Sequence, residues 1–433
     1  MAMRSTLKRL PLISEFCREL MHLLWRGSKN WGIVSRVDFR DTLGAVAASR
    51  IGRLILSLVS AWAISAAECA QAQDITGQLP GILPGLGYTN YFLSDEPWSI
   101  HVISMDRKDP TLSLHSFHSR GLAIGMATLT DQIRRVNPEI GQPIAAINGD
   151  FYQRERAFAG DPRGIQIIEG ELVSGPNDRA TMWVDTNGQP NLAVVTSRFA
   201  VTWPEGSVGT FDLNGERAPD GTELYTPALG GTTRTQGGHE VILEKGPDGP
   251  WLPLKIGQSY SARVREVREE GNAEIAPGTM VLSLGPAARF PASVIPGSIV
   301  NLNLATLPSL LGARVAISGG PTLLRGGKRQ RVAPKSESYE STSMLERHPR
   351  TAIGWNKTTF YFVEVDGRQK GLSVGMTLDE VATLLSKLGC EDGMNLDGGG
   401  SSTLWAAGRV RNKPCDGHER MIANSLMILR SEK

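Results

Sequence analysis

Alternation of hydrophobic and polar positions dominates the chain from residue 98 onward and predicts a protein rich in β-strands. The segments SIHVISMD at 99–106 and TLSLHSFHS at 111–119 alternate with a period of two, which is typical of strands that bury one face. Apolar runs at 144–147, 350–355 and 359–365 predict further strands, the last of them strongly β-branched and aromatic. This pattern favours sheets over a helix bundle.

Helical periodicity is confined to two short segments. Residues 130–136 predict a short helix, and residues 378–388 predict a longer amphipathic one. Thr377 and Glu380 have the spacing of a capping box at the start of the second helix, and Gly389 follows its end. The middle of the chain, 198–310, contains short β-rich pieces without a catalytic signature, and we interpret it as a β-rich insertion.

The composition indicates a globular protein, and its charge gives no reason to expect nucleic acid or a membrane as a partner. Glycine contributes 48 of the 433 residues, more than the usual share of about 7%, which fits many turns and short strands. The formal net charge is +2, so no overall charge points to nucleic acid or to an anionic membrane.

The first hundred residues have the pattern of an export leader. Arg50 and Arg53 precede an uncharged apolar run, and Ala70-Gln71-Ala72 has the small-residue spacing of a signal-peptidase site. The run is shorter than the roughly 20 residues of a membrane-spanning helix, so we expect no stable membrane anchor. We therefore predict a spurious or disordered extension at 1–49, a signal peptide at 50–72, a linker at 73–97, and a periplasmic or secreted protein.

An oxidising compartment makes a disulfide between Cys390 and Cys415 a reasonable hypothesis. Both cysteines lie in the mature chain, whereas Cys17 and Cys69 lie in the leader. Two unrelated thiols are the alternative, because sequence gives no distance between the residues.

The sharpest candidate for chemistry is Asp397, at the end of a predicted buried strand. It is followed by Gly398, Gly399, Gly400 and Ser401, a loop whose backbone N–H groups can approach an anion or a sugar closely. The pattern is neither a P-loop nor a dinucleotide fingerprint. A tight turn with Asp397 as a local cap is the alternative interpretation.

Three other strand ends carry polar clusters. Asn148, Asp150 and Tyr152 form one, and aromatic rings beside polar groups suit sugar rings. Glu364, Asp366 and Arg368 form the second. Arg350 opens a third strand, where its guanidinium could clamp a phosphate. Taken singly, each could be a turn or a surface ion pair. The sequence has no metal-binding motif, so no cofactor is expected, although a hard cation on Asp and Asn oxygens stays open.

Seven short segments in this order resemble the phosphodiester glycosidase family, which includes the catalytic domain of a lysosomal uncovering enzyme. The resemblance covers about residues 140–430 and is weakest in the middle. The matching segments are NGDFY at 148–152, SGGPTL at 318–323, HPRTAIG at 348–354, VDGR at 365–368, SVGMTL at 373–378, NLDGGGSS at 395–402, and NKP at 412–414 with Glu419-Arg420 and Asn424-Ser425.

The resemblance implies an α+β fold, with mixed β-sheets flanked by helices in a single large catalytic domain at 98–433. It also implies a hydrolase that cleaves a sugar-1-phosphodiester, such as one of N-acetylglucosamine in envelope or extracellular polysaccharide, into free sugar and a phosphomonoester. A phosphate leaving group needs little acid assistance, so one carboxylate and a charge clamp could replace the usual carboxylate pair.

On this hypothesis Asp397 is the nucleophile or general base, with Glu364 or Asp366 in reserve. Arg350 holds the phosphate, the Gly398–Gly400 amides stabilise charge, and Asn148 and Asp150 bind sugar hydroxyls. Tyr152, Gly320, Arg368 and Ser401 complete the expected binding set. Two alternatives stay open: a non-catalytic carbohydrate- or cell-wall-binding protein, and a metal-dependent phosphodiesterase that cuts P–O instead of C–O.

Overall fold

The structure is a computed structural model that describes residues 80–431, apart from residues 95, 96, 121, 122, 156, 334, 337, 338 and 341. The predicted extension at 1–49 and the signal peptide at 50–72 lie outside the described residues. Residues 81–93, which the sequence interpretation assigned to a linker, instead form two strands of a large sheet. That assignment was wrong because the glycines and prolines there flank strands rather than replace them.

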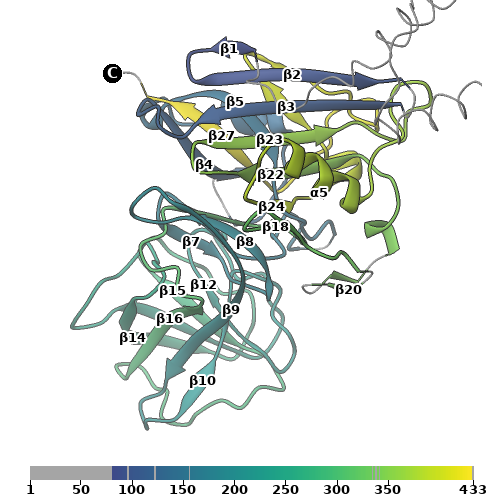
Figure 1. The fold of residues 1–433 in the computed structure, drawn as a ribbon. Helices are drawn as coiled ribbons and strands as arrows, with labels where there is room; N and C mark the ends of the chain where they lie inside the picture. Colours follow the sequence, from purple (N-terminus) through teal and green to yellow (C-terminus); the bar gives the residue numbers. More distant parts are fainter. Residues whose placement is uncertain are drawn as a thin grey trace, which may run out of the picture. The chain divides into compact units, whose positions relative to one another are not determined.

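An eight-stranded antiparallel sheet carries most of the predicted motifs (Figure 1). Its strands, in spatial order, are β1 (Gly81–Leu83), β2 (Leu86–Leu93), β3 (Trp98–Asp106), β23 (Thr359–Val365), β22 (Arg350–Trp355), β24 (Asp392–Asn395), β18 (Thr322–Arg325) and β19 (Lys328–Arg329). The predicted strands at 350–355 and 359–365 are confirmed. In the register of this pair, Arg350 lies opposite Val365 and Thr351 lies opposite Glu364.

A five-stranded antiparallel sheet packs against one face of the eight-stranded sheet. Ile147, Leu404 and Leu426 from the smaller sheet share a core with Ile103, Ile353 and Phe362 from the larger one. Its strands, in spatial order, are β26 (Arg409–Val410), β25 (Leu404–Ala406), β5 (Gln142–Asn148), β27 (Asn424–Arg430) and β4 (Leu112–His118).

All strands of a third, twelve-stranded sheet lie within residues 166–318, and the predicted hairpins at Glu169-Gly170 and Asn187-Gly188 are both present in it. One apolar core collects side chains from strands along almost the whole of this sheet. Its strands are β11 (Asp212–Leu213), β12 (Thr222–Tyr225), β15 (Met280–Leu284), β13 (His239–Lys245), β14 (Ser259–Arg268), β16 (Ile299–Leu307), β9 (Pro190–Thr202), β8 (Arg179–Val184), β17 (Val315–Ser318), β6 (Gln166–Ile168) and β7 (Glu171–Ser174), with β10 (Val208–Thr210) paired to β9.

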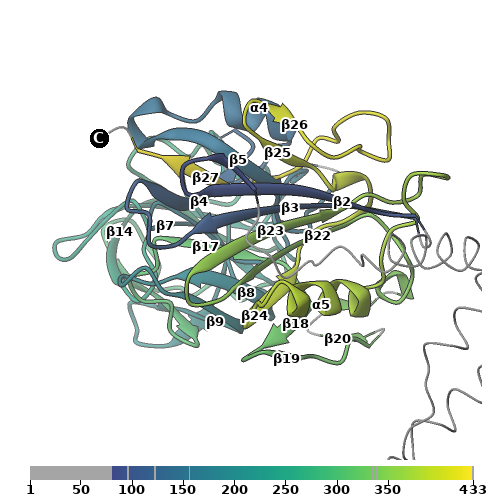
Figure 2. The same ribbon diagram turned by 45° about the horizontal axis from the view of Figure 1, so that its top comes forward.

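The described chain has two α-helices, and each lies against one sheet. Helix α5 (Leu378–Lys387) has the predicted capping box and packs against β18 and β22 of the eight-stranded sheet (Figure 2). Helix α4 (Leu129–Arg134) lies against β5 of the five-stranded sheet. The remaining elements are short: η1 (Pro138–Ile140), η2 (Thr342–Met344), η3 (Gly399–Ser401), and the strand pair β20 (Lys335–Ser336) and β21 (Tyr339–Glu340).

The predicted fold class, α+β with sheets flanked by helices, was therefore wrong. Within the described residues the chain is nearly all β. The eight-stranded and five-stranded sheets share one core, and the strands of the twelve-stranded sheet pack on one another around a second core. The helices were an expectation of the family resemblance. In the part of the chain that the structure describes, only two segments were predicted as helices, and the alternating strands instead supply apolar faces that pack on one another. Neither helix has the length and apolar character needed to cross a membrane.

Candidate active site

A cavity of about 560 Å³ opens at the end of β24, on the face of the eight-stranded sheet that also carries α5. Its wall combines one carboxylate, four arginines and two aromatic rings. Of the predicted site residues, Asp397, Arg350, Tyr152 and Gly320 line it. The full lining is Phe151, Tyr152, Arg154, Arg163, Arg179, Gly320, Pro321, Ser343, Met344, Arg350, Leu378, Asn395 and Asp397.

The position of Asp397 is fixed by its own backbone. Its N–H donates to the carbonyl of Gly149 at 2.9 Å, and its carbonyl accepts from the side-chain amide of Asn148 at 2.6 Å. Its carboxylate Oδ1 accepts from the N–H of Gly398 at 2.9 Å. The motifs at 148–152 and 395–402 are therefore joined directly, and together they hold one buried carboxyl group at the cavity wall.

Two carboxyl groups, those of Asp150 and Asp397, lie at this junction, and the charge of Asp397 affects the pKa of Asp150. Burial raises the pKa of Asp397, while the Ser401 hydroxyl and Arg154 act in the opposite direction. Burial also raises the pKa of Asp150 to about 7; Arg179 lowers it, and the negative charge of Asp397 adds to the rise. Asp150 therefore holds its proton at neutral pH more readily than an ordinary carboxyl group, which favours Asp397 as the charged member of the pair.

Arg350 is a buried cation that lines the cavity. Its Nε donates to the carbonyl of Met376 at 2.9 Å, and its Nη2 donates to the carbonyls of Ser343 and Glu346, each at 2.7 Å. Burial and the nearby Arg368 lower its pKa to about 10, so it stays charged at neutral pH. Among the described residues no carboxylate forms a salt bridge with it, which leaves its charge available to an anionic ligand.

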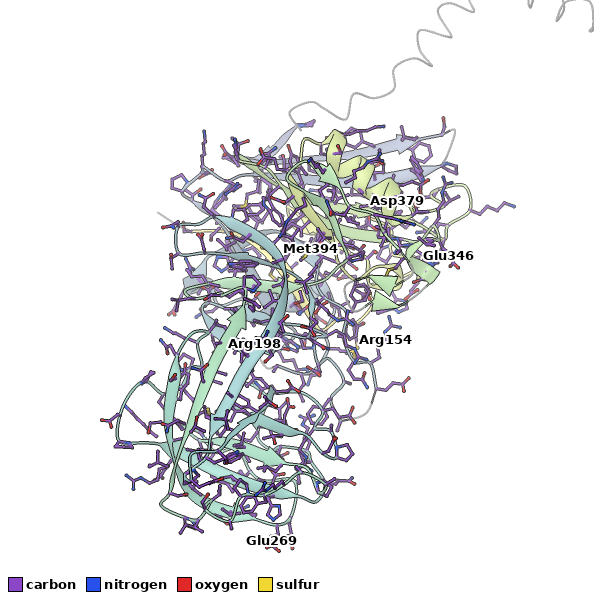
Figure 3. The ribbon with its side chains drawn as sticks, turned by 60° about the horizontal axis from the view of Figure 1, so that its bottom comes forward. Arg154, Arg198, Glu269, Glu346, Asp379 and Met394 are labelled. Carbon is purple, nitrogen blue, oxygen red and sulfur yellow. The ribbon has the colours of Figure 1, made fainter. Side chains whose placement is uncertain are left out.

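The other three arginines of the wall were missed by sequence reasoning. Arg154 and Arg163 come from the loop between β5 and β6, and Arg179 begins β8; Figure 3 labels Arg154 on that loop. The guanidinium of Arg154 lies 5.8 Å from the ring centre of Tyr152. No local motif marks these residues as a group, because they are scattered over turn-rich stretches of the sequence. Their convergence makes the cavity strongly cationic.

The predicted cradle of glycine amides is not open to a ligand at its first two positions. The N–H of Gly398 donates to Asp397, and the N–H of Gly399 donates to the carbonyl of Pro349 at 2.9 Å. At Gly400 a Cβ would lie 1.9 Å from Nη2 of Arg420, the end of a flexible side chain that would have to move aside. The loop therefore orients Asp397 and packs tightly, and the arginines supply the positive charge.

Asn148 lies beneath the site instead of in it. Its Oδ1 accepts from the Thr351 hydroxyl at 2.8 Å and from the Thr403 N–H at 3.0 Å, while its amide holds Asp397. With its side chain fully engaged and buried, Asn148 is a positioning residue and not a ligand for a sugar hydroxyl. The Tyr152 hydroxyl donates to the carbonyl of Met421 at 2.8 Å, so it is engaged within the protein, and Tyr152 also lines the cavity.

Glu364 and Asp366 lie on the opposite face of the sheet from Arg350. Strand alternation explains this, because Thr351 and not Arg350 is the register partner of Glu364. Burial raises the pKa of Glu364 well above its ordinary value, and Asp366 adds to the rise. Together with His101 they form a separate buried cluster, which could hold a metal ion. Neither carboxylate lines the cavity, and Arg368 stands apart from its wall as well.

The hypothesis of a disulfide between Cys390 and Cys415 was wrong, and the alternative of two unrelated thiols holds. Cys390 is buried beneath α5 and Cys415 lies beside Asp416, and both are free thiols.

Residues 267–429 match one known protein family, the phosphodiester glycosidases. The resemblance inferred from the seven motifs is thereby confirmed over that segment. A curated relative, the SPbeta prophage-derived uncharacterized protein YomE of Bacillus subtilis (strain 168), is 34% identical over 119 residues. That match covers 27% of this chain and 18% of the relative, so the chain spans less than a fifth of that protein.

Two crystal structures share the fold. A hypothetical protein from Synechocystis aligns with a TM-score of 0.65 and 20% identity, over 80% of this chain and 62% of its own. A Burkholderia pseudomallei K96243 protein whose name describes it as exported aligns with a TM-score of 0.59 and 22% identity, over 77% of this chain and 74% of its own. Similarity at this level establishes the fold alone.

Proposed function

We propose that this protein, whose residues 267–429 match the phosphodiester glycosidases, hydrolyses a sugar-1-phosphodiester into free sugar and a phosphomonoester. The observation that carries the proposal is the composition of the cavity wall, in which a single buried carboxylate faces four arginines and two aromatic rings. Arginines suit the phosphate of such a substrate, and the rings of Phe151 and Tyr152 suit the apolar face of a sugar.

Asp397 is the reacting carboxylate in this proposal. Either Asp397 removes a proton from a water molecule that attacks the anomeric carbon, or Asp397 attacks that carbon itself and water then hydrolyses the bond between sugar and carboxylate. In both cases the bond between the anomeric carbon and the phosphate oxygen breaks. The departing phosphomonoester takes the bonding electrons, and the cavity arginines stabilise its added negative charge. Burial raises the pKa of Asp150 to about 7, so this carboxyl group is partly protonated near neutral pH, which reduces the negative charge beside Asp397.

Arg350 supports the reaction by its rigidity. Three backbone carbonyls hold its guanidinium in place, so its orientation is set before substrate binds. A preorganised cation costs little reorganisation when charge develops on the leaving group. Ser401, whose buried hydroxyl lies beside the carboxylate and acts to lower the pKa of Asp397, helps to hold that group in its charged form.

The proposal includes export from the cytoplasm. It is supported by the leader pattern at 50–72 and by the exported relative of similar fold. Phosphodiester-linked sugars of envelope or extracellular polysaccharide are then the substrates within reach.

The test is release of free sugar from an aryl phosphodiester of N-acetylglucosamine, measured for wild type and for Asp397→Asn. We expect the variant to lose turnover by about a thousandfold or more, because the amide can neither attack nor accept a proton. Asp392→Asn is the matched control: it removes a carboxylate from the same strand, β24, at the end away from the cavity, and should keep wild-type turnover.

Three results would contradict the proposal. Binding of the substrate without sugar release by wild type would indicate a carbohydrate-binding protein. Hydrolysis in ¹⁸O-labelled water that places the label in the phosphate would indicate cleavage of P–O. Full activity of Asp397→Asn together with loss of activity in Glu364→Gln would show that the reacting carboxylate lies on the other face of the sheet.

A further inference from the structure

A second polar cluster lies between the eight-stranded and five-stranded sheets, away from the cavity. His101 on β3, Glu364 on β23 and Asp366, just after β23, each offer a ligand atom within 4.8 Å of the others. Their side chains point to the same sheet face as Ile103 and Phe362, which belong to the core between the sheets. All three residues are buried, with exposures of 5%, 0% and 2% in that order.

Neither carboxylate oxygen of Glu364 meets the geometry of a hydrogen bond within the part of the chain that the structure describes, although the neighbouring side chain of Asn412 acts to lower its pKa. A fully buried carboxyl group with two unpartnered oxygens is costly, and most such groups have a partner. Asp366 is better placed: its Oδ1 accepts from the N–H of Lys413 at 2.8 Å, and its Oδ2 lies 3.2 Å from Nε2 of His101. No lysine or arginine side chain of the described residues forms a salt bridge with either carboxylate.

The imidazole of His101 is oriented for a ligand on Nε2. Its Nδ1 lies 2.9 Å from the Tyr88 hydroxyl, and donation from Nδ1–H to that oxygen leaves the Nε2 lone pair directed at the carboxylates. The Ser99 hydroxyl and the side-chain amide of Asn90 each lie 3.2 Å from Nε2. Asn90, on β2, is itself exposed.

We propose that His101, Glu364 and Asp366 bind one zinc ion. Imidazole nitrogen and carboxylate oxygen are both zinc ligands, whereas calcium and magnesium prefer oxygen alone. Zinc bonds of about 2.0–2.1 Å in tetrahedral geometry place neighbouring ligand atoms about 3.3 Å apart. The separation of 3.2 Å between Nε2 of His101 and Oδ2 of Asp366 fits that value. Water, or the Asn90 side chain, completes the coordination.

Zinc here would stabilise the structure and take no part in the cavity chemistry. It would link β3 and β23 to the 412–415 segment, which Asp366 already contacts through Lys413. It would also support Asp397 at a distance, because Thr351 is paired with Glu364 and its hydroxyl holds Asn148. The proposal does not depend on the proposed hydrolase activity.

The test measures zinc content and affinity of the full chain after chelator treatment and dialysis, with zinc sulfate as the probe. We expect one zinc per chain by mass spectrometry of the metal, and a higher thermal midpoint when zinc is added. Glu364→Gln, which keeps the side-chain shape, should weaken binding more than a hundredfold, and Tyr88→Phe should weaken it about 10- to 100-fold. His115→Asn is the matched control, because His115 also contacts a carboxylate, Glu169, without a third ligand.

X-ray absorption on zinc-loaded wild type gives a readout that needs no variant. We expect nitrogen and oxygen neighbours, including one imidazole, and no sulfur. The proposal is overturned if wild type binds no zinc, or if Glu364→Gln and Tyr88→Phe both bind zinc as tightly as wild type. It is also overturned if His115→Asn abolishes zinc binding. Sulfur neighbours in the absorption spectrum would overturn it as well, because they would indicate Cys390 or Cys415 as ligands. If circular dichroism shows that Glu364→Gln does not fold, the zinc affinity of Tyr88→Phe and the absorption spectrum of wild type test the proposal instead.

Discussion

Replacing Asp150 with asparagine should remove a large part of the pH dependence of folding stability. Burial raises the pKa of this carboxyl from 3.8 to about 7 in the folded protein, with the charge of Asp397 adding to the rise. The folded state therefore keeps a proton that the unfolded chain releases near pH 4. Stability falls as pH increases through this window, since the folded protein must either hold the proton or ionise a buried group.

The size of the effect follows from the shift. Each pKa unit corresponds to about 1.4 kcal/mol, so Asp150 costs the wild type about 4 kcal/mol between pH 4 and pH 7.5. Asparagine cannot ionise, and its Oδ1 can still accept the N–H of Phe151, which lies 2.8 Å from the carboxylate in wild type. Relative to wild type, Asp150→Asn should therefore gain about 4 kcal/mol of stability across this pH range.

The assay is urea denaturation of both proteins at pH 4, 5, 6, 7 and 8. Burial also raises the pKa of Glu223 well above its ordinary value, and that contribution is common to variant and wild type. Burial raises the pKa of Asp161 to about 8, and the charge of Asp150 adds to that rise, so the variant also loses this part of the Asp161 shift. Asp131→Asn, at an exposed carboxyl on α4, controls for the loss of one negative charge. A difference that stays constant within 1 kcal/mol, or that falls as pH rises, would refute the reasoning.

Two further predictions concern stability around α5. Thr377→Ala removes the hydroxyl that accepts from the N–H of Glu380 at 3.2 Å and should cost about 1 kcal/mol in urea denaturation, whereas Thr377→Ser should cost much less. Gly354→Ala should cost about 1–3 kcal/mol, because its Cβ would lie 2.7 Å from Sγ of Cys390 and 3.0 Å from Leu385. Adding Cys390→Ala should recover part of that loss in a double-mutant cycle, and strict additivity of the two changes would count against this explanation.

Local sequence patterns determined the individual elements well. The strands at 350–355 and 359–365 and the capping box of α5 follow from alternation and from the chemistry of Thr377 and Glu380. These features depend on neighbours along the chain, which the sequence lists directly. The order of the short motifs also predicted the family match, and Asp397 was placed correctly at a strand end beside a glycine loop.

The packing of the sheets determined the fold class and which of the predicted site residues face the cavity. Alternation divides the side chains of β22 and β23 between two faces, but only the packing of α5 on one face and the five-stranded sheet on the other shows where each set lies. Arg350 thus lines the cavity while Glu364 faces His101.

The cavity arginines show most clearly that a site formed by distant segments cannot be found from local sequence patterns. Arg154, Arg163 and Arg179 are ordinary residues of turns and strand starts in the sequence, and they gain a shared role only because distant segments meet at Asp397. Hydrogen bonding also reassigned residues, since Asn148 and the first two loop glycines use their polar groups within the protein. The sequence thus determined which strands and turns form, because those depend on short-range sterics and polarity. Long-range contacts decided which of their side chains face a common cavity.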